Sequence, residues 1–88
     1  MRQKLDIIHE KGLHARASAK FVETVERHEA SASVEKDGLM AQGDSIMGLL
    51  MLAAGRGTTI EVETSGVEAK ELAKALANLL EDRFGEKA

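Results

Sequence analysis

Residues 58–84 read TTIEVETSGVEAKELAKALANLLEDRF, and the hydrophobic period changes within this stretch. Over 58–64, apolar and polar residues alternate, which predicts a half-buried strand with Ile60 and Val62 facing inward. A Ser-Gly turn follows, and over 68–84 the apolar residues recur at helical spacing. A strand followed at once by an amphipathic helix predicts a mixed fold. The apolar stripe of this helix consists of Ala69, Leu72, Ala73, Leu76, Leu79 and Leu80.

The rest of the chain switches between the same two periods. Alternation predicts strands over 4–9, 32–36 and 39–42, and helical spacing predicts helices over 15–28 and 46–52. An Asp-Gly pair between the second and third strands predicts a tight hairpin turn. The expected fold class is therefore α+β: an open sandwich with a four-stranded, antiparallel or mixed sheet and helices on one face. The pattern does not fix the strand order.

The composition narrows the function classes. With 88 residues, the chain has room for one domain, which we expect to span residues 1–88. The absence of cysteine excludes disulfides, thiolate metal sites and cysteine nucleophiles. Phe21 and Phe84 are the only aromatic residues, and the net charge is −3. Few aromatic rings and an acidic balance both argue against nucleic-acid binding.

Nothing in the sequence predicts export or membrane insertion. The first six residues include Arg2, Lys4 and Asp6 and lack the apolar stretch of a signal peptide. The longest apolar run, over 46–55, is far shorter than the roughly 20 residues that a membrane span needs. We therefore expect a cytoplasmic protein.

The most informative stretch for chemistry is Gly12-Leu13-His14-Ala15-Arg16, where the first strand ends and the first helix begins. No Ser, Thr, Asp or Asn lies in the three positions before Arg16, so the first helical N–H groups have no obvious side-chain acceptor. Such a helix start favours an anion. The imidazole of His14 can act as a transient nucleophile toward a phosphoryl group, and Arg16 can neutralise that group.

This stretch has two other interpretations: a solvated surface pair, which stays open, and a metal site, which is weaker. A histidine beside an arginine at a helix start is usually a solvated surface pair, and spacing alone does not exclude it here. A metal site is not predicted, because His9, His14 and His28 lie at unrelated spacings with no second ligand on the same face. We expect no cofactor.

The second stretch of interest is the predicted helix over 46–52, which is apolar nearly all round. Ser45 before it is predicted to be its N-cap, and a phosphate at that position would be stabilised by the helix. One interpretation is a deeply buried short helix. The other is that Ile46, Met47 and Met51 stay exposed as an adaptable patch for protein partners.

These residues together resemble the HPr family, the histidine-containing phosphocarrier proteins of the bacterial phosphoenolpyruvate:sugar phosphotransferase system. The resemblance covers essentially the whole chain. It rests on Gly12-Leu13-His14-Ala15-Arg16 followed by Ser18-Ala19, on residues 43–52 and on residues 57–62. It implies an open-faced β-sandwich in which three helices cover one face of a four-stranded antiparallel sheet.

The resemblance also implies roles for individual residues. His14 would be phosphorylated on its δ nitrogen by enzyme I and would pass the group to an enzyme IIA domain, with Arg16 assisting. Ser45 would match the regulatory serine modified by HPr kinase/phosphorylase in organisms that have it. The chain would be a phosphoryl carrier, not an enzyme, and we expect a monomer. The implied docking residues are Ala19, Lys20, Ile46, Met47 and Met51.

The chain departs from the family pattern beside the His14 motif. Ala17 stands where the family usually has proline, and we expect only a small change in stability. Two other functions are alternatives to the sugar-pathway carrier. A carrier in a nitrogen-related regulatory relay would use the same chemistry. A non-carrier interaction module would act only through Ser45 and the patch over 46–51, but family members of that kind lack the histidine that stands here at position 14.

Overall fold

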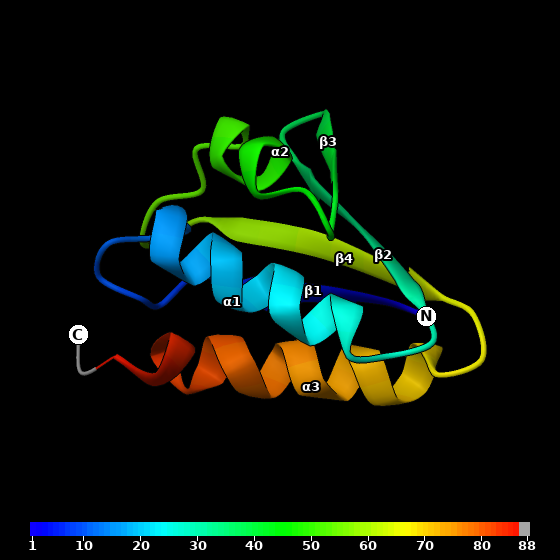
Figure 1. Ribbon diagram of the computed structural model, residues 1–88. Helices are drawn as coiled ribbons and strands as arrows, with labels where there is room; N and C mark the ends of the chain where they lie inside the picture. The colour runs from blue at the N-terminus through cyan, green and yellow to red at the C-terminus, as the bar shows by residue number, and fades with distance from the viewer. Residues whose placement is uncertain (87–88) are drawn as a thin grey trace.

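The computed structural model describes residues 1–86, and its elements follow the predicted order (Figure 1). A single turn of 3-10 helix, η1, follows the last α-helix. The elements are β1 (Arg2–Asp6), α1 (Ala15–Glu26), β2 (Ser31–Lys36), β3 (Leu39–Gln42), α2 (Ile46–Met51), β4 (Thr59–Ser65), α3 (Ala69–Glu81) and η1 (Arg83–Gly85).

The four strands form one antiparallel sheet in the order β1-β4-β2-β3. The register places Leu5 opposite Ile60 and Val34 opposite Val62. The helices α1 and α3 cover one face of the sheet (Figure 1). Because side chains alternate across a strand, these buried residues share that face, and Glu61, between Ile60 and Val62, belongs to the other face. The short α2 packs against α1 and β3. The predicted open-faced α+β sandwich is confirmed, with the sheet wholly antiparallel.

The prediction of the first strand over 4–9 is wrong at both ends, because β1 spans Arg2–Asp6. At Ile7 the chain pairs instead with the loop before β4: its N–H donates to the Thr58 carbonyl at 2.8 Å. A turn closed by the Gly12 N–H and the His9 carbonyl, at 3.0 Å, then redirects the chain. His9 is therefore a buried loop residue, not the end of a strand.

Two helix ends also differ from prediction. The helix predicted over 15–28 ends at Glu26. The helix predicted over 68–84 ends at Glu81, because Arg83, Phe84 and Gly85 have φ values of 52°, 56° and 77°, which an α-helix excludes. Phe84 is nevertheless buried, so the last aromatic residue joins the core from a turn.

The core lies between the sheet and the helices. Val34, Ile60 and Val62 from the sheet are fully buried, as are Leu72 and Leu76 from the predicted stripe of α3. Within residues 1–86, no helix is long and apolar enough to cross a membrane.

Candidate functional site

The loop between β1 and α1 is clamped against the loop that follows α2. Gly12 has φ +65°, and a Cβ there would lie 2.6 Å from the Ala54 carbonyl oxygen, so glycine is required for this close approach. The next N–H, that of Leu13, donates to the same carbonyl at 2.9 Å. Leu13 is buried and anchors the loop. The clamp fixes the backbone that leads into His14.

His14 is the N-cap of α1. Its backbone is extended, and its Nδ1 accepts a hydrogen bond from the Arg16 N–H at 3.1 Å. The expectation that the first helical donors lack a side-chain acceptor is therefore wrong, since the imidazole takes the place that a serine or aspartate usually fills. The sequence hides this arrangement, because histidine is not among the usual caps.

The cap hydrogen bond assigns the ring nitrogens of His14. A nitrogen that accepts from a backbone N–H carries a lone pair, so in the neutral ring the proton is on Nε2. That Nε2 lies 3.4 Å from Glu86 Oε2, at a carboxylate that can hold the proton there. The nitrogen with the available lone pair is therefore Nδ1.

Glu86 was not singled out from the sequence. Its second oxygen, Oε1, lies 3.1 Å from His9 Nε2, so the carboxylate sits between two imidazoles. Burial alone would raise the pKa of Glu86, but the close contact with His9 and the positive charges that Arg16 carries and that His9 and His14 carry when protonated outweigh it and hold the pKa below its ordinary value of 4.5. The carboxylate form is therefore favoured at the site.

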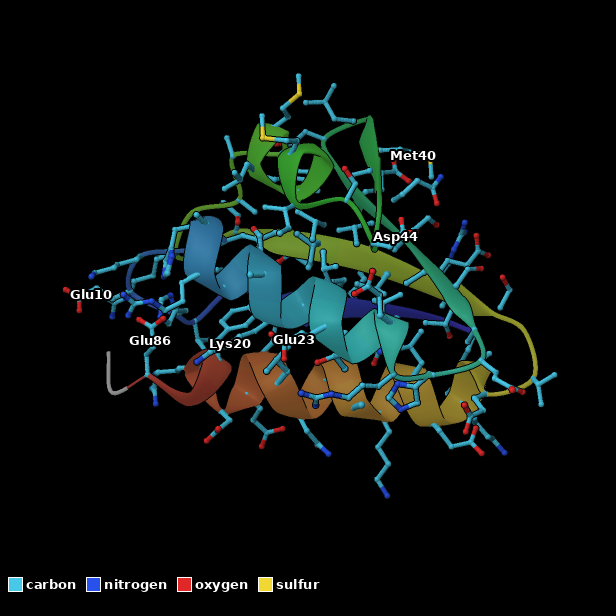
Figure 2. All side chains as sticks on the ribbon, viewed as in Figure 1. Glu10, Lys20, Glu23, Met40, Asp44 and Glu86 are labelled. Atoms are coloured by element: carbon cyan, nitrogen blue, oxygen red, sulfur yellow. The ribbon has the colours of Figure 1, made fainter. Side chains whose placement is uncertain are left out.

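The C-terminal turn brings Glu86 to the start of α1 (Figure 2). Phe84 is buried against the His9 ring in an edge-on contact, with 5.6 Å between the ring centroids. The Lys20 ammonium donates to the Phe84 carbonyl, which ties the turn to α1. A glycine such as Gly85 after a helix is a signal for the end of that helix only, and it does not indicate where Glu86 lies.

Two of the three histidines come together. The His9 and His14 rings lie 5.0 Å apart between centroids, and their ligand nitrogens and the Glu86 carboxylate lie within 4.8 Å of one another. The argument that no second ligand shares a face with His14 is therefore wrong. His28 does not join them, because its Nδ1 lies 2.7 Å from the Thr24 carbonyl at the far end of α1.

Arg16 is exposed beside His14, and within residues 1–86 no carboxylate lies close enough to pair with its guanidinium. The first turn of α1 also contains no acidic residue. The positive end of the helix and the guanidinium are thus available to an incoming anion, with Glu86 as the nearby negative group.

The second predicted site has the expected local structure. Ser45 caps α2, its Oγ accepting from the Gly48 N–H at 3.0 Å. Leu49 is buried, whereas Ile46, Met47 and Met51 are 39%, 69% and 75% exposed. Of the two interpretations left open, the exposed patch is the one observed. We call Ile46, Met47 and Met51 the α2 patch.

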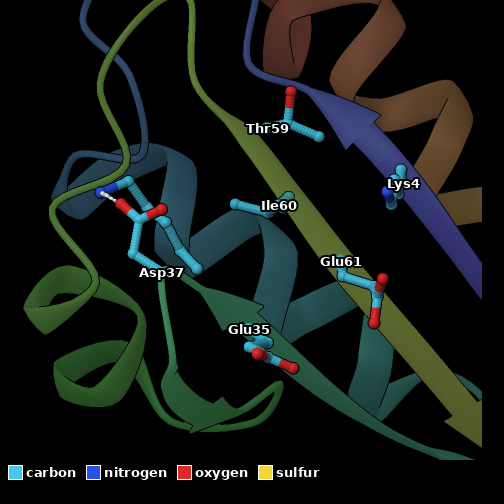
Figure 3. Close-up of a pocket in the computed structure, with 7 residues that line it drawn as sticks. Lys4, Glu35, Asp37, Thr59, Ile60 and Glu61 are labelled. Atoms are coloured by element: carbon cyan, nitrogen blue, oxygen red, sulfur yellow. Dashed lines mark hydrogen bonds and ion pairs between the residues drawn. The ribbon is translucent and has the colours of Figure 1, made fainter.

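The other predicted docking residues, Ala19 and Lys20, are half-buried on α1, which packs beside α2. A separate hollow of about 230 Å³ lies over β1, β2 and β4 (Figure 3). Within it, Lys36 and Asp37 pair with each other at 3.2 Å. None of its lining residues belongs to the His14 site. They are Lys4, Glu35, Lys36, Asp37, Thr59, Ile60 and Glu61.

Comparison with known proteins agrees with this geometry. The family model described as the phosphorylation site of the HPr component of the phosphotransferase system matches residues 1–82. The phosphocarrier protein HPr of Neisseria meningitidis serogroup A is 45% identical over 86 residues, covering 98% of this chain and 97% of the relative.

Two further relatives extend the comparison. The crystal structure of HPr from Thermoanaerobacter tengcongensis superposes with a TM-score of 0.95 at 34% identity, covering 100% of this chain and 99% of the other. The HPr-like protein Crh of Halalkalibacterium halodurans is 41% identical over 70 residues, covering 80% of this chain and 83% of the relative. By its sequence over nearly its full length, and by its fold, the chain belongs to the HPr family of phosphocarrier proteins of the phosphotransferase system.

Proposed function

We propose that residues 1–88 act as one carrier domain that accepts a phosphoryl group on His14 Nδ1 from phosphorylated enzyme I and passes it to an enzyme IIA domain. The observation that carries this proposal is the cap hydrogen bond, because it makes Nδ1 the nitrogen with the lone pair. Family membership supplies the pathway. The chain is then a carrier that is modified covalently and returned, with no reaction catalysed on a free substrate.

In the forward step, the Nδ1 lone pair attacks phosphorus in line with the leaving atom of the donor. The new N–P bond forms as the bond between phosphorus and enzyme I breaks, and the electron pair leaves with the donor. The attack displaces the Arg16 N–H from Nδ1, and this donor then becomes free to bond a phosphoryl oxygen at the helix start. The proton on Nε2 stays beside Glu86, whose charge balances the ring.

Arg16 contributes a mobile positive charge at the same place. Its guanidinium is exposed and has no carboxylate partner within residues 1–86, so it is free to bond two phosphoryl oxygens. The stabilisation must stay moderate, since the group has to move on to the acceptor. The site is consistent with this requirement because it is open on the solvent side.

We propose that successive partners dock on the α2 patch together with Ala19 and Lys20. Methionine side chains adapt to different surfaces, and these are exposed beside the His14 end of α1. One face that serves each partner in turn favours a monomer, and the partners named place the chain in the cytoplasm.

Ser45 is the proposed regulatory site for HPr kinase/phosphorylase where that enzyme is present. A phosphate there would lie at the start of α2, within the docking face, and would add two negative charges to an apolar surface. Partner binding would weaken as a result.

A second candidate function is a non-carrier module that acts only through Ser45 and the α2 patch. The similarity to an HPr-like Crh protein and the exposed methionines favour it. His14 with a free Nδ1 argues for the carrier instead.

The test is incubation of the chain with enzyme I and labelled phosphoenolpyruvate. We expect an acid-labile label on the wild type, none on His14→Ala, and an unchanged label on the control His28→Ala. Addition of an enzyme IIA domain should discharge the label. An unlabelled wild type would favour the interaction module, and a labelled His14→Ala variant would contradict the assignment of His14.

A further inference from the structure

His9, His14 and Glu86 each direct a potential metal-ligand atom into one cluster, and the proposed phosphoryl transfer does not use His9. Two imidazole nitrogens and one carboxylate converge within 4.8 Å, with Glu86 oxygens 3.1 Å from His9 Nε2 and 3.4 Å from His14 Nε2. We propose that these three residues bind a divalent transition-metal ion of the Zn²⁺ class. Zn–N and Zn–O bonds of about 2.0–2.1 Å at tetrahedral angles place neighbouring ligand atoms about 3.3–3.4 Å apart.

His9 is arranged as a metal ligand would be. Its Nδ1 lies 3.1 Å from the Gly12 carbonyl oxygen, which can only accept, so Nδ1 carries the proton. The neutral ring then points the lone pair of Nε2 into the cluster. A hydrogen bond from the distal nitrogen to a backbone carbonyl is the usual support of a metal-bound imidazole, because it fixes the tautomer and the ring plane.

The same arrangement leaves a buried nitrogen of His9 without a hydrogen-bond partner. His9 is 1% exposed, and its Nε2 has no hydrogen-bond partner of good geometry. Neutral His9 would place a lone pair 3.1 Å from a carboxylate oxygen, and two acceptors at that distance repel each other. A cation between them removes the repulsion. A metal ion is one such cation, and a proton on His9 Nε2 is its competitor.

The cluster has an accessible side. The side chains of His14 and Glu86 are 26% and 18% exposed, against 1% for His9, so an ion would enter from the side of His14. The atoms His14 Nε2 and Glu86 Oε2 are themselves buried, which leaves the fourth coordination position to a small ligand such as water. Three protein ligands with one open position are typical of zinc sites that hold water or an exchangeable ligand.

A metal at this position would change which nitrogen of His14 is free. A neutral imidazole has one unprotonated nitrogen, so binding through Nε2 moves the ring proton to Nδ1. Nδ1 then cannot accept from the Arg16 N–H or attack phosphorus. Metal binding and phosphoryl acceptance therefore exclude each other in the unphosphorylated chain. This consequence rests on the proposed function, whereas the metal site itself does not.

The test uses the full chain, freed of metal, with no phosphoryl donor present. Titration with Zn²⁺ by calorimetry and with Co²⁺ by visible absorption should give one ion per chain with the spectrum of a four- or five-coordinate site. Glu86→Gln and His9→Gln should each weaken binding by at least about tenfold. His28→Gln, which alters an imidazole outside the cluster, should leave it unchanged.

An independent readout covers the case in which His9→Gln fails to fold. In ¹⁵N imidazole spectra of the wild type, Zn²⁺ should shift Nε2 of His9 and of His14, move the His14 proton to Nδ1, and leave His28 unshifted. The proposal is overturned by absent binding at millimolar metal with His9 protonated, or by binding that Glu86→Gln does not weaken. Because no enzyme I is used, failure of the carrier function would not affect either result.

Discussion

The starts of α1 and α2 are capped in similar ways but differ in chemistry. At α1 the cap is the His14 imidazole, and at α2 it is the Ser45 hydroxyl; each accepts one backbone N–H. The imidazole has a second nitrogen, which reaches Glu86, and an arginine beside it. The hydroxyl of Ser45 is followed along the chain by two exposed apolar residues, Ile46 and Met47. In the proposed function, the cap beside charged groups is the nucleophile, and the cap beside exposed methionines lies in the docking face.

The position of the His14 cap depends on the close contact of Gly12 and Leu13 with the Ala54 carbonyl. The largest expected loss of stability is therefore for Gly12→Ala. The left-handed conformation costs about 1–2 kcal/mol with alanine, and the clash with the Ala54 carbonyl adds about 1–3 kcal/mol of overpacking. Chemical denaturation measures the total. Gly38→Ala is the matched control, because Gly38 has φ +84° with open space around it, so only the conformational cost should appear. Equal losses in the two variants would argue against the clamp.

Removal of the charge at α1 should separate its chemistry from its capping. Arg16→Ala is expected to slow phosphorylation of His14 by about 10–100-fold, the value of a charge-assisted hydrogen bond, with little change in stability. Rapid-quench labelling with enzyme I gives the rate. Arg27→Ala, at the other end of the same helix and paired with Glu23, is the control and should transfer at the wild-type rate. An unchanged rate in Arg16→Ala would remove the guanidinium from the proposed mechanism.

The corresponding change at α2 should affect stability and leave the chemistry alone. Ser45→Ala is expected to lower the free energy of unfolding by about 1 kcal/mol, the value of an N-cap. Labelling at His14 should continue at the wild-type rate. Ser65→Ala removes a hydroxyl at the end of β4 whose only hydrogen bond within residues 1–86 is an exposed one to the Ser31 hydroxyl, so it provides the baseline in the same urea titration. Loss of His14 labelling in Ser45→Ala would show that the two helix starts are not independent.

The smallest expected effect is a pH dependence that only the α1 site should have. Because folding lowers the pKa of Glu86, this group stabilises the folded state above its ordinary pKa of 4.5, and the contribution is lost as pH falls through the lowered value. Urea unfolding of wild type and Glu86→Gln should therefore converge in acid. The same difference measured in a His9→Gln background should be smaller. If the difference in unfolding free energy between wild type and Glu86→Gln widened as the pH fell, the pKa of Glu86 would not be lowered by folding.

The local features of the α2 start and of the β2–β3 hairpin were predictable, whereas the His14 cap of α1 and the long-range contacts were not. The Ser45 cap and the Asp37-Gly38 hairpin follow from residue types a few positions apart, and both are observed; Asp37 and Gly38 have the positive φ values such a turn needs. The contact of Glu86 with His14 joins opposite ends of the chain. It depends on the turn at Phe84 and on the Lys20 hydrogen bond, neither of which has a local sequence signal.

His9 is buried although it lies outside β1. Residues 4–7 alternate strictly and Ile8 continues the apolar pattern, so the predicted strand reaches His9, which lies in a turn. The period does not distinguish a strand from a loop whose side chains happen to alternate between core and solvent. The strand order was likewise not derivable, because it depends on which non-local pairs bury the most apolar surface.

The central claim is that Nδ1 of His14 is the free nitrogen and the one that takes the phosphoryl group. The direct measurement is ¹⁵N imidazole spectroscopy of the metal-free chain before and after phosphorylation by enzyme I and phosphoenolpyruvate. We predict a neutral His14 with its proton on Nε2 beforehand and phosphorus coupling to Nδ1 afterwards. A proton on Nδ1 in the free chain, or phosphorus on Nε2 or on another residue, would contradict this account.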